Sequence, residues 1–542
     1  MKKGATYIFL ALFTALALFL RFYNLSTIPQ GFHTDELTAG YVGLKIIQTG
    51  KDLYGNFLPV YFNTFGDFRP TGIFYLSGIS AFLFGFNQFA VRLPSALFGA
   101  IAVIGLYFLA KEIFKNKTIG LLSALLLTIL PWHVVLSRGT SEGIIGLSFV
   151  IWGTYFLYAL PKKPNKANLL TGSLLLFISM FFYHPFRIIS PLLFIPLFFI
   201  KVSGKKIKRS IGIAFVILVL IFLLIATQKW GSGRLSQVAF YNNPDSEKLY
   251  ALFYGDEKTT PGPIIRFYHN KVTIATRDLA KQVFRHTSPE YLFTNGGLPD
   301  RYSVPEQGLL YFFFIPFLLL AIIHVKKYPQ ELGILLYFLF LGLAPAVITF
   351  DDTPNVHRSI FMMVPIVIMT AFGINTFIGF VKKQRTVGMY LLLILLTATA
   401  IFEVLYFWHQ YTIHSVKHKV FARSDGFKEI AEQLERERTL YDKVYAPYNE
   451  QLPIYYLFFN KLDNLTLSPY TKDPEIAFQL NNIYFVKDWC ATKVVERRNI
   501  DDKGEKIMIV DGRDCLENKN FSYIGRVTRT DGSVAFTVYK NR

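Results

Sequence analysis

Long stretches without charge dominate this sequence and constrain its fold more than any other feature. Ile211–Thr227 and Met389–Phe402 are two such stretches, and neither contains a charged residue. Protein can cross a lipid bilayer only as helices or as a closed barrel, and each crossing helix needs about 20 apolar residues. Charged residues make up only 17% of the chain, against about 25% in soluble proteins. We therefore predict an all-α polytopic membrane protein.

Eleven segments are predicted to span the membrane. They are 5–22, 93–110, 118–136, 144–160, 169–183, 189–201, 210–227, 308–324, 332–349, 359–381 and 386–408. The first has no small-residue cleavage site after it, so we interpret it as a retained helix and not as a signal peptide. A further apolar stretch, Ile73–Phe86, is short and contains glycines. We predict that it is a helix embedded in the outer leaflet.

The charged connections between these segments indicate their orientation. The net charge is +20, and the basic residues gather in short runs such as Lys205–Arg209 and Lys382–Arg385. Under the positive-inside rule these runs face the cytoplasm. The external segments are then 23–92, 137–143, 184–188, 228–307, 350–358 and the tail from residue 409. Because the charge is explained by topology and by attraction to anionic headgroups, we expect no nucleic-acid partner.

The chain changes character at residue 409. We predict a transmembrane domain over 1–408 and a small extracytoplasmic α/β domain over 409–542. In the tail, the amphipathic stretch Phe427–Arg438 predicts a helix. Short runs rich in β-formers predict strands; they are KVYAP, IYYLFF, IYFV, KIMIV and VAFTVY. Cys490 and Cys515 both lie here, and an external location permits either a disulfide or two separate thiols.

Acids and arginines recur in the predicted external segments. They occur in GFHTDELTAGY, GDFRP, SRGTSEG, YHPFR and DDTPNVHR. Ionisable groups near lipid are costly and usually functional. A carboxylate can deprotonate a hydroxyl acceptor, and arginine matches the geometry of a phosphate. Together these groups fit the transfer of a group from a lipid-linked phosphate to a hydroxyl.

At these motifs the sequence resembles the GT-C membrane glycosyltransferases. The resemblance consists of an acidic pair after the first helix, a basic-Pro step, "RLPS" at the start of the next span and "SR" near the end of the following one. It is greatest to the branch of the protein O-mannosyltransferases and the lipid A aminoarabinose transferase (glycosyltransferase family 39), and it covers about residues 1–360. "SPEYLF" in the large loop 228–307 also resembles bacterial members.

The resemblance implies roles for individual residues. Asp35 is expected to be the catalytic base, and its neighbour Glu36 is a second catalytic candidate, although Asp35 could instead cap a helix that starts at Glu36. Arg69 is expected to contact the donor phosphate, although Thr71 follows Pro70 where relatives have a second proline. Further phosphate-binding candidates are Arg138, Arg187 and Arg358. The other site candidates are Asp67, Arg92, Glu142, Tyr183, His184 and His357.

The implied function is transfer of a sugar from a polyprenyl-phosphate donor to a hydroxyl acceptor at the outer face of the plasma (inner) membrane, with inversion at the sugar. Membrane lipid and an acceptor of unknown kind are the other expected partners. No cofactor is established by these residues. A divalent metal stays open, because oligosaccharyltransferases have metal-binding acids at the position of Glu142. The alternatives are a transporter or flippase of lipid-linked sugars, and an oligosaccharyltransferase or polymer ligase of the same fold.

Overall fold

The computed structural model describes the chain except for residues 1–2, 65–66, 162–163, 201, 203, 229–236, 257–261, 449–451, 463–472, 499–503 and 542. The described residues form two compact units. The first comprises Met1–Tyr23, Val60–Ile73 and Ser95–Gln410, and the second comprises Asn24–Pro59, Phe74–Pro94 and Tyr411–Arg542.

The first unit is a bundle of apolar helices. Those long and apolar enough to span are α1 (Lys3–Phe22), α4 (Gln88–Phe114), α11 (Lys205–Ala226), α17 (Pro329–Val347), α18 (Met363–Gln384) and α19 (Val387–His409). The pair α5 (Lys117–Ile129) and α6 (Pro131–Arg138) adds one span if it is counted as one, with a bend of 54°. Among the described residues, length and composition therefore support six or seven spans, and the predicted count of eleven is not confirmed.

Each of the remaining predicted spans nevertheless contains a shorter apolar helix. These are α7 (Glu142–Tyr158), α8 (Lys166–Ser179), α9 (His184–Leu192) with α10 (Ile195–Phe199), and α16 (Phe314–Ile323). Small residues bring some helices close together. A Cβ on Gly373 of α18 would lie 2.0 Å from the main-chain oxygen of Phe317 in α16, so only glycine fits this contact.

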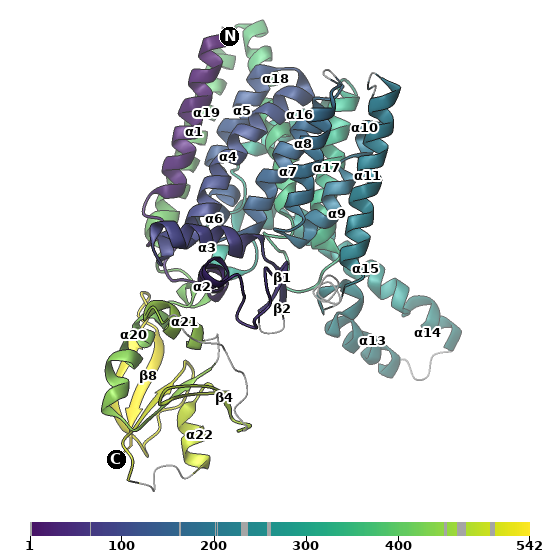
Figure 1. The fold of residues 1–542 in the computed structure, drawn as a ribbon. Helices are drawn as coiled ribbons and strands as arrows, with labels where there is room; N and C mark the ends of the chain where they lie inside the picture. The colour runs from purple at the N-terminus through teal and green to yellow at the C-terminus, as the bar shows by residue number, and fades with distance from the viewer. Residues whose placement is uncertain are drawn as a thin grey trace. The chain divides into compact units, whose positions relative to one another are not determined.

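The two ends of the bundle differ. Figure 1 shows the N-terminus, α18 and the connection from α10 to α11 at one end, and the β1–β2 hairpin at the other. The hairpin pairs β1 (Tyr61–Thr64) with β2 (Asp67–Pro70), and Phe62 lies opposite Arg69. We call the first the lysine end, because Lys205 and Lys206 begin α11 there and Lys382 and Lys383 lie in the last turn of α18, and we call the second the hairpin end. Beyond α11 the chain forms α13 (Pro244–Asp256), α14 (Gly262–Tyr268) and α15 (Lys271–Thr287).

The second unit contains α2 (Thr34–Thr49), most of α3 (Gly72–Phe84) and a mixed sheet in the predicted tail domain. α3 has 13 residues and covers most of Ile73–Phe86, where a helix was predicted, and its place in the outer leaflet stays a prediction. The sheet is ordered β4-β5-β3-β6-β8-β7. Its strands are Ile476–Leu480, Ile483–Val486, Lys443–Pro447, Ile507–Asp511, Val534–Lys540 and Ser522–Thr528, in that spatial order. β3 pairs in parallel with both of its neighbours, β5 and β6, and the other pairings are antiparallel.

Three short helices accompany the sheet: α20 (Phe427–Glu437), α21 (Leu452–Phe459) and α22 (Ala491–Arg497). The first confirms the amphipathic prediction. The second corrects one: IYYLFF forms a helix and not a strand. Leu452–Phe458 are all buried, and Pro453 suits the first turn of a helix. A short, fully apolar run has no periodicity that separates a buried strand from a buried helix, which explains the error.

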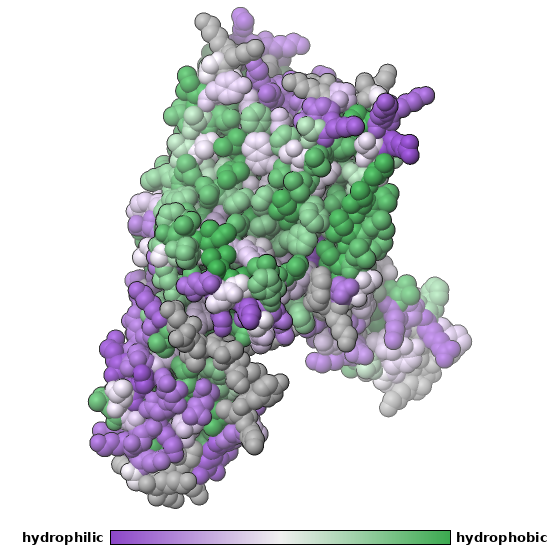
Figure 2. All heavy atoms as spheres, in the orientation of Figure 1, coloured by the Kyte–Doolittle hydropathy of each residue, from purple (hydrophilic) through white to green (hydrophobic). Residues whose placement is uncertain are grey.

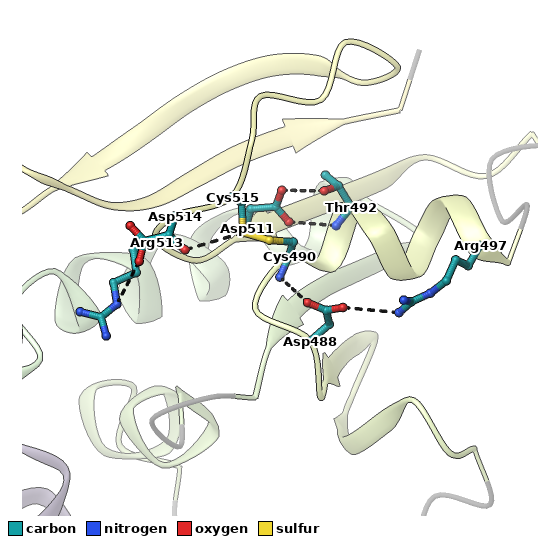
Figure 3. The surroundings of a disulfide bond; sticks show 8 residues. All are labelled: Asp488, Cys490, Thr492, Arg497, Asp511, Arg513, Asp514 and Cys515. Atoms are coloured by element: carbon teal, nitrogen blue, oxygen red, sulfur yellow. Dashed lines mark hydrogen bonds and ion pairs between the residues drawn. A yellow bond between two sulfur atoms is a disulfide. The ribbon is translucent and has the colours of Figure 1, made fainter. Parts of the chain in front are cut away.

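Cys490 and Cys515 form a disulfide, with their Cα atoms 5.7 Å apart. Figure 3 shows the bond beside Asp511, the last residue of β6, whose carboxylate accepts hydrogen bonds from the main-chain N–H of Thr492 at 2.9 Å and from its hydroxyl at 2.6 Å. Burial raises the pKa of the Asp511 carboxyl, although the bonds from Thr492 oppose this shift. The disulfide and Asp511 together fasten the start of α22 to the end of β6.

Candidate active site

Asp35 lies in the first turn of α2, in the second unit. The N-cap of this helix is His33, whose ring Nδ1 accepts the main-chain N–H of Asp35 at 3.1 Å. The same nitrogen lies 3.5 Å from the Asp35 carboxylate, and about 20% of the Asp35 side chain is exposed. Asp35 therefore does not cap the helix. Its carboxylate is partly accessible and has an imidazole beside it, an arrangement that suits proton transfer.

Glu36 has a different environment from Asp35. Its carboxylate pairs with the fully buried Arg92, at 2.8 Å from Nε and 3.3 Å from Nη2. Arg92 also donates to the main-chain oxygens of Leu25, Pro29 and Gly31. A guanidinium has five N–H donors, and these five bonds use all of them. We therefore assign Glu36 and Arg92 to holding the segment before α2, and we leave Arg92 out of the proposed phosphate site.

The first unit brings most of the other predicted residues to its hairpin end. They are Arg69, Glu142, Tyr183, His184, Arg187, His357 and Arg358. Asp67 begins β2, but its side chain lies outside the described residues. Arg69 lies two residues further along this strand and is partly buried. Its neighbour Phe68 provides the main-chain oxygen that contacts His184 Nε2 at 3.1 Å, so the hairpin rests on the start of α9.

Aromatic rings and cations connect the elements at this end. The Tyr61 ring lies 6.3 Å from the His184 ring, and the Arg187 guanidinium lies 4.9 Å from the centre of the same Tyr61 ring. The ring of Tyr183, the N-cap of α9, meets the His357 ring edge-on at 5.8 Å, and Tyr302 stacks on that imidazole at 4.8 Å. We call Tyr61, Ser141, Tyr183, His184, Arg187, Tyr302 and His357 the hairpin-end cluster.

Glu142 and Ser141, a member of the hairpin-end cluster, both lie at the start of α7. Ser141, the N-cap, accepts the N–H of Ile144 at 3.2 Å, and its hydroxyl lies 3.3 Å from His357 Nε2. Glu142 follows in the first turn, where a carboxylate is favoured by the helix dipole. Among the described residues, no three His, Cys, Asp or Glu side chains are grouped in a way that could hold a metal ion.

Arg358 is held beside the cluster by its own segment. It forms an ion pair with Asp351 at 2.6 Å, donates to the Asp351 main-chain oxygen at 2.8 Å and donates to the Thr349 hydroxyl at 3.0 Å. Asn355 accepts the N–H groups of His357 and Arg358 at 3.0 and 2.8 Å. Asp351, the first acid of the motif DDTPNVHR, is thus the ionic partner of Arg358.

A buried histidine supports this turn. The main-chain N–H of Asn355 donates to His286 Nε2 at 2.9 Å. Burial lowers the pKa of His286, which favours the neutral ring that such an acceptor requires. The position of the His357–Arg358 segment therefore depends on His286 of α15.

Arg138 has contacts of a structural kind. Its guanidinium donates to the main-chain oxygens of Leu20 and Tyr23 at the end of α1 and lies 5.8 Å from the centre of the Trp408 ring. Terminal helix carbonyls have no partner within their own helix, and a cation there is favourable. Arg138 therefore stabilises the end of α1, and we do not count it among the proposed phosphate ligands.

Contributors that were missed from the sequence include Tyr61, Ser141, Tyr302 and Asn355. Ser141 carried a usable signal, because serine directly before an apolar helix is a preferred N-cap. The two tyrosines had none, since 31 tyrosines are spread along the chain. Their roles depend on contacts between segments that are far apart in sequence.

Comparison with known proteins agrees with this fold. Residues 69–230 match the profile of a family described as dolichyl-phosphate-mannose-protein mannosyltransferase, a range that includes Arg69, Arg138, Glu142 and Arg187. No curated protein sequence matches the chain. ArnT from Cupriavidus metallidurans, solved bound to undecaprenyl phosphate, aligns with 100% of this chain and 99% of its own at 12% identity and a TM-score of 0.51.

The archaeal oligosaccharyltransferase AglB from Archaeoglobus fulgidus, solved in complex with an inhibitory peptide and a dolichol-phosphate, is also similar. The match covers 84% of this chain and 64% of AglB at 13% identity, with a TM-score of 0.52. The chain thus spans just under two thirds of the length of that protein. Its fold is that of the GT-C membrane glycosyltransferases, and the resemblance inferred from the sequence is confirmed.

Proposed function

We propose that this protein is a membrane glycosyltransferase that moves a sugar from a polyprenyl-phosphate donor to a hydroxyl acceptor. The observation that carries the proposal is the match of residues 69–230 to the mannosyltransferase family, within a fold shared with ArnT and AglB, both solved with a polyprenyl phosphate. Of the basic side chains at the hairpin end, Arg69 and Arg187 lie within the matched residues, and Arg358 lies outside them. A transporter has no comparable support among the described residues.

In the proposed reaction, the acceptor oxygen attacks the anomeric carbon of the sugar from the side opposite the phosphate. The new carbon–oxygen bond forms as the bond to the phosphate oxygen breaks, so the configuration inverts. The Asp35 carboxylate takes the acceptor proton, and polyprenyl phosphate leaves with the bonding electron pair. His33 caps the start of α2 by accepting the main-chain N–H of Asp35, which fixes the position of the Asp35 main chain.

Arg69 is the proposed main ligand of the donor phosphate, because it is on the hairpin and within the family match. Arg187 and Arg358 are the further proposed ligands at the hairpin end. Arg187 lies against Tyr61, and Arg358 is oriented by Asp351 and Thr349. Positive charge that is already in place when the phosphate leaves stabilises the transition state without reorganisation.

The test uses purified protein in lipid vesicles with a panel of polyprenyl-phosphate sugars, and it measures release of polyprenyl phosphate. Asp35→Asn should lower turnover by about 10²–10⁴-fold, the usual contribution of a general base, while donor binding stays intact. Arg69→Ala should weaken donor binding by about 1.5–3 kcal/mol, and Arg69→Lys should recover part of the loss.

Matched controls are Asp245→Asn and Arg277→Ala, exposed residues of α13 and α15 that should leave both measurements unchanged. Wild-type turnover by a folded Asp35→Asn protein would remove Asp35 from the reaction. If no donor in the panel releases polyprenyl phosphate while labelled lipid moves between leaflets, the transporter alternative would be correct. Including donors with whole glycans distinguishes single-sugar transfer from glycan transfer.

A further inference from the structure

The first unit has an apolar groove at its lysine end, away from the candidate active site. The groove has a volume of about 650 Å³ and lies between α10 and the first half of α17. It is lined by Ile195, Pro196, Phe199, Ile200, Pro329, Gln330, Gly333, Ile334 and Tyr337. This volume is within the range of about 300–1,000 Å³ typical of ligand sites. No lining residue is charged, and only Gln330 and Tyr337 have polar side chains, so the lining suits a hydrocarbon chain.

The groove is open at its rim, and a hydrogen bond joins two helices on its inner side. Phe199 is 86% exposed at its rim, and no atom lies within 4 Å of the Cβ position of Gly333. On its inner side, the hydroxyl of Tyr337 donates to the main-chain oxygen of Leu192 at 3.0 Å, which joins α17 to the end of α9. Because the helices around it are apolar on their outer faces, the groove opens toward lipid.

The groove and the proposed phosphate site lie at opposite ends of α17. Pro329, at the start of α17, lines the groove, whereas Thr349, just beyond the end of α17, bonds Arg358. The 19 residues of α17 extend about 28 Å at 1.5 Å per residue. A donor whose phosphate lies near Arg358 therefore has its headgroup at the other end of the bundle.

Positive charge surrounds the polar end of the groove. Lys326 and Lys327 precede Tyr328, the N-cap of α17, and α11, which follows α10, begins with Lys205 and Lys206. The stretches 195–215 and 322–340 contain a single acid, Glu331. Figure 2 shows hydrophilic residues gathered at this end of the bundle, above an apolar band. Basic clusters beside gaps between transmembrane helices attract anionic lipid headgroups.

We propose that this groove is a binding site for an anionic membrane phospholipid, with an acyl chain between α10 and α17 and the phosphate near Lys326 and Lys327. The apolar lining selects a hydrocarbon chain, and the lysines select a negative headgroup over a zwitterionic one. The site is distinct from the proposed donor site, and the inference does not depend on the proposed function.

The test measures lipid retained by the purified protein, using native mass spectrometry with phosphatidylglycerol, phosphatidylcholine of equal chain length, and undecaprenyl phosphate. Gly333→Trp places a ring in the open groove. Retention of phosphatidylglycerol should fall by about tenfold, the loss expected if roughly two methylene groups are no longer buried. The matched control is Gly379→Trp on α18, which also has no atom within 4 Å of its Cβ position and should retain lipid as the wild type does.

Lys326→Gln with Lys327→Gln should remove the preference for phosphatidylglycerol over phosphatidylcholine without abolishing lipid retention. If Gly333→Trp fails to fold, Gly333→Leu provides a smaller filling side chain for the same measurement. Unchanged retention in a folded Gly333 variant would overturn the proposal. Equal retention of the two phospholipids by the wild type would also overturn it. So would displacement of phosphatidylglycerol by undecaprenyl phosphate at a site that depends on Gly333.

Discussion

Replacing Glu36 by glutamine should destabilise the second unit far more than replacing its neighbour Asp35 by asparagine. Glu36 is the ionic partner of Arg92, which has no solvent exposure. Glutamine keeps one acceptor oxygen near the guanidinium but removes the negative charge. Loss of one partner of a buried ion pair costs about 3–5 kcal/mol, because the remaining charge is left buried without compensation. We expect the lower part of this range, since the carbonyls of Leu25, Pro29 and Gly31 still accept from Arg92.

The matched variant Asp35→Asn changes the adjacent residue in the same way. Its carboxylate is partly exposed and lies 3.5 Å from His33, a contact of a kind that contributes about 1 kcal/mol or less. Thermal unfolding of the purified proteins, followed by tryptophan fluorescence, and limited proteolysis of the segment before α2 would measure the difference. Equal stability of the two variants would refute the structural role of the Glu36–Arg92 pair. Wild-type stability of Asp35→Asn with lost turnover would agree with the division of roles proposed for the two acids.

Three further predictions concern the packing and chemistry of the second unit. Cys490→Ser should lower the stability of the tail by about 3–4 kcal/mol, as the chain-entropy account gives for the loop closed with Cys515, and unfolding in denaturant with and without reductant would measure the loss. The pKa of the Asp511 carboxyl is raised above 3.8, so the folded tail binds the carboxyl proton more tightly than the unfolded tail does. The stability of the tail should therefore fall as the pH rises from 3.8 through the raised pKa. Asp511→Asn should flatten this dependence of stability on pH, as measured by hydrogen exchange. A Cβ on Gly78 would lie 2.2 Å from a main-chain oxygen of α2, so Gly78→Ala should cost about 1–3 kcal/mol in thermal unfolding, whereas Gly388→Ala, with no atom within 4 Å, should cost nothing measurable.

Local pattern was a good guide wherever short stretches of sequence carry the signal. Each predicted span contains an apolar helix, the stretch 118–136 is a helix pair bent around Pro131, and α20 and four of the five predicted tail strands lie close to their expected positions. Proline inside a span breaks the helix hydrogen bonding, which explains the bend. The IYYLFF helix and the unpredicted strands β4 and β7 show where pattern fails, because neighbours in the sheet determine them.

Roles of single residues were harder to predict, because they depend on partners far away in the sequence. Glu36 and Arg92 are 56 residues apart, and Arg138 meets the end of α1 across 118 residues. Arginine side chains therefore have different surroundings in the two units. Arg69 lies on a short hairpin, whereas Arg92 uses every N–H group on internal acceptors.

By itself, the sequence determined that this chain is a membrane protein and which apolar segments become helices, because hydrophobic length is a local property that the bilayer selects directly. It also determined the motifs that resemble GT-C glycosyltransferases. Only the tertiary structure decided which cations are held by internal acceptors, that Cys490 and Cys515 are joined, and that a groove remains open between α10 and α17. Burial and hydrogen-bond satisfaction depend on which distant segments meet, and no local pattern contains that information.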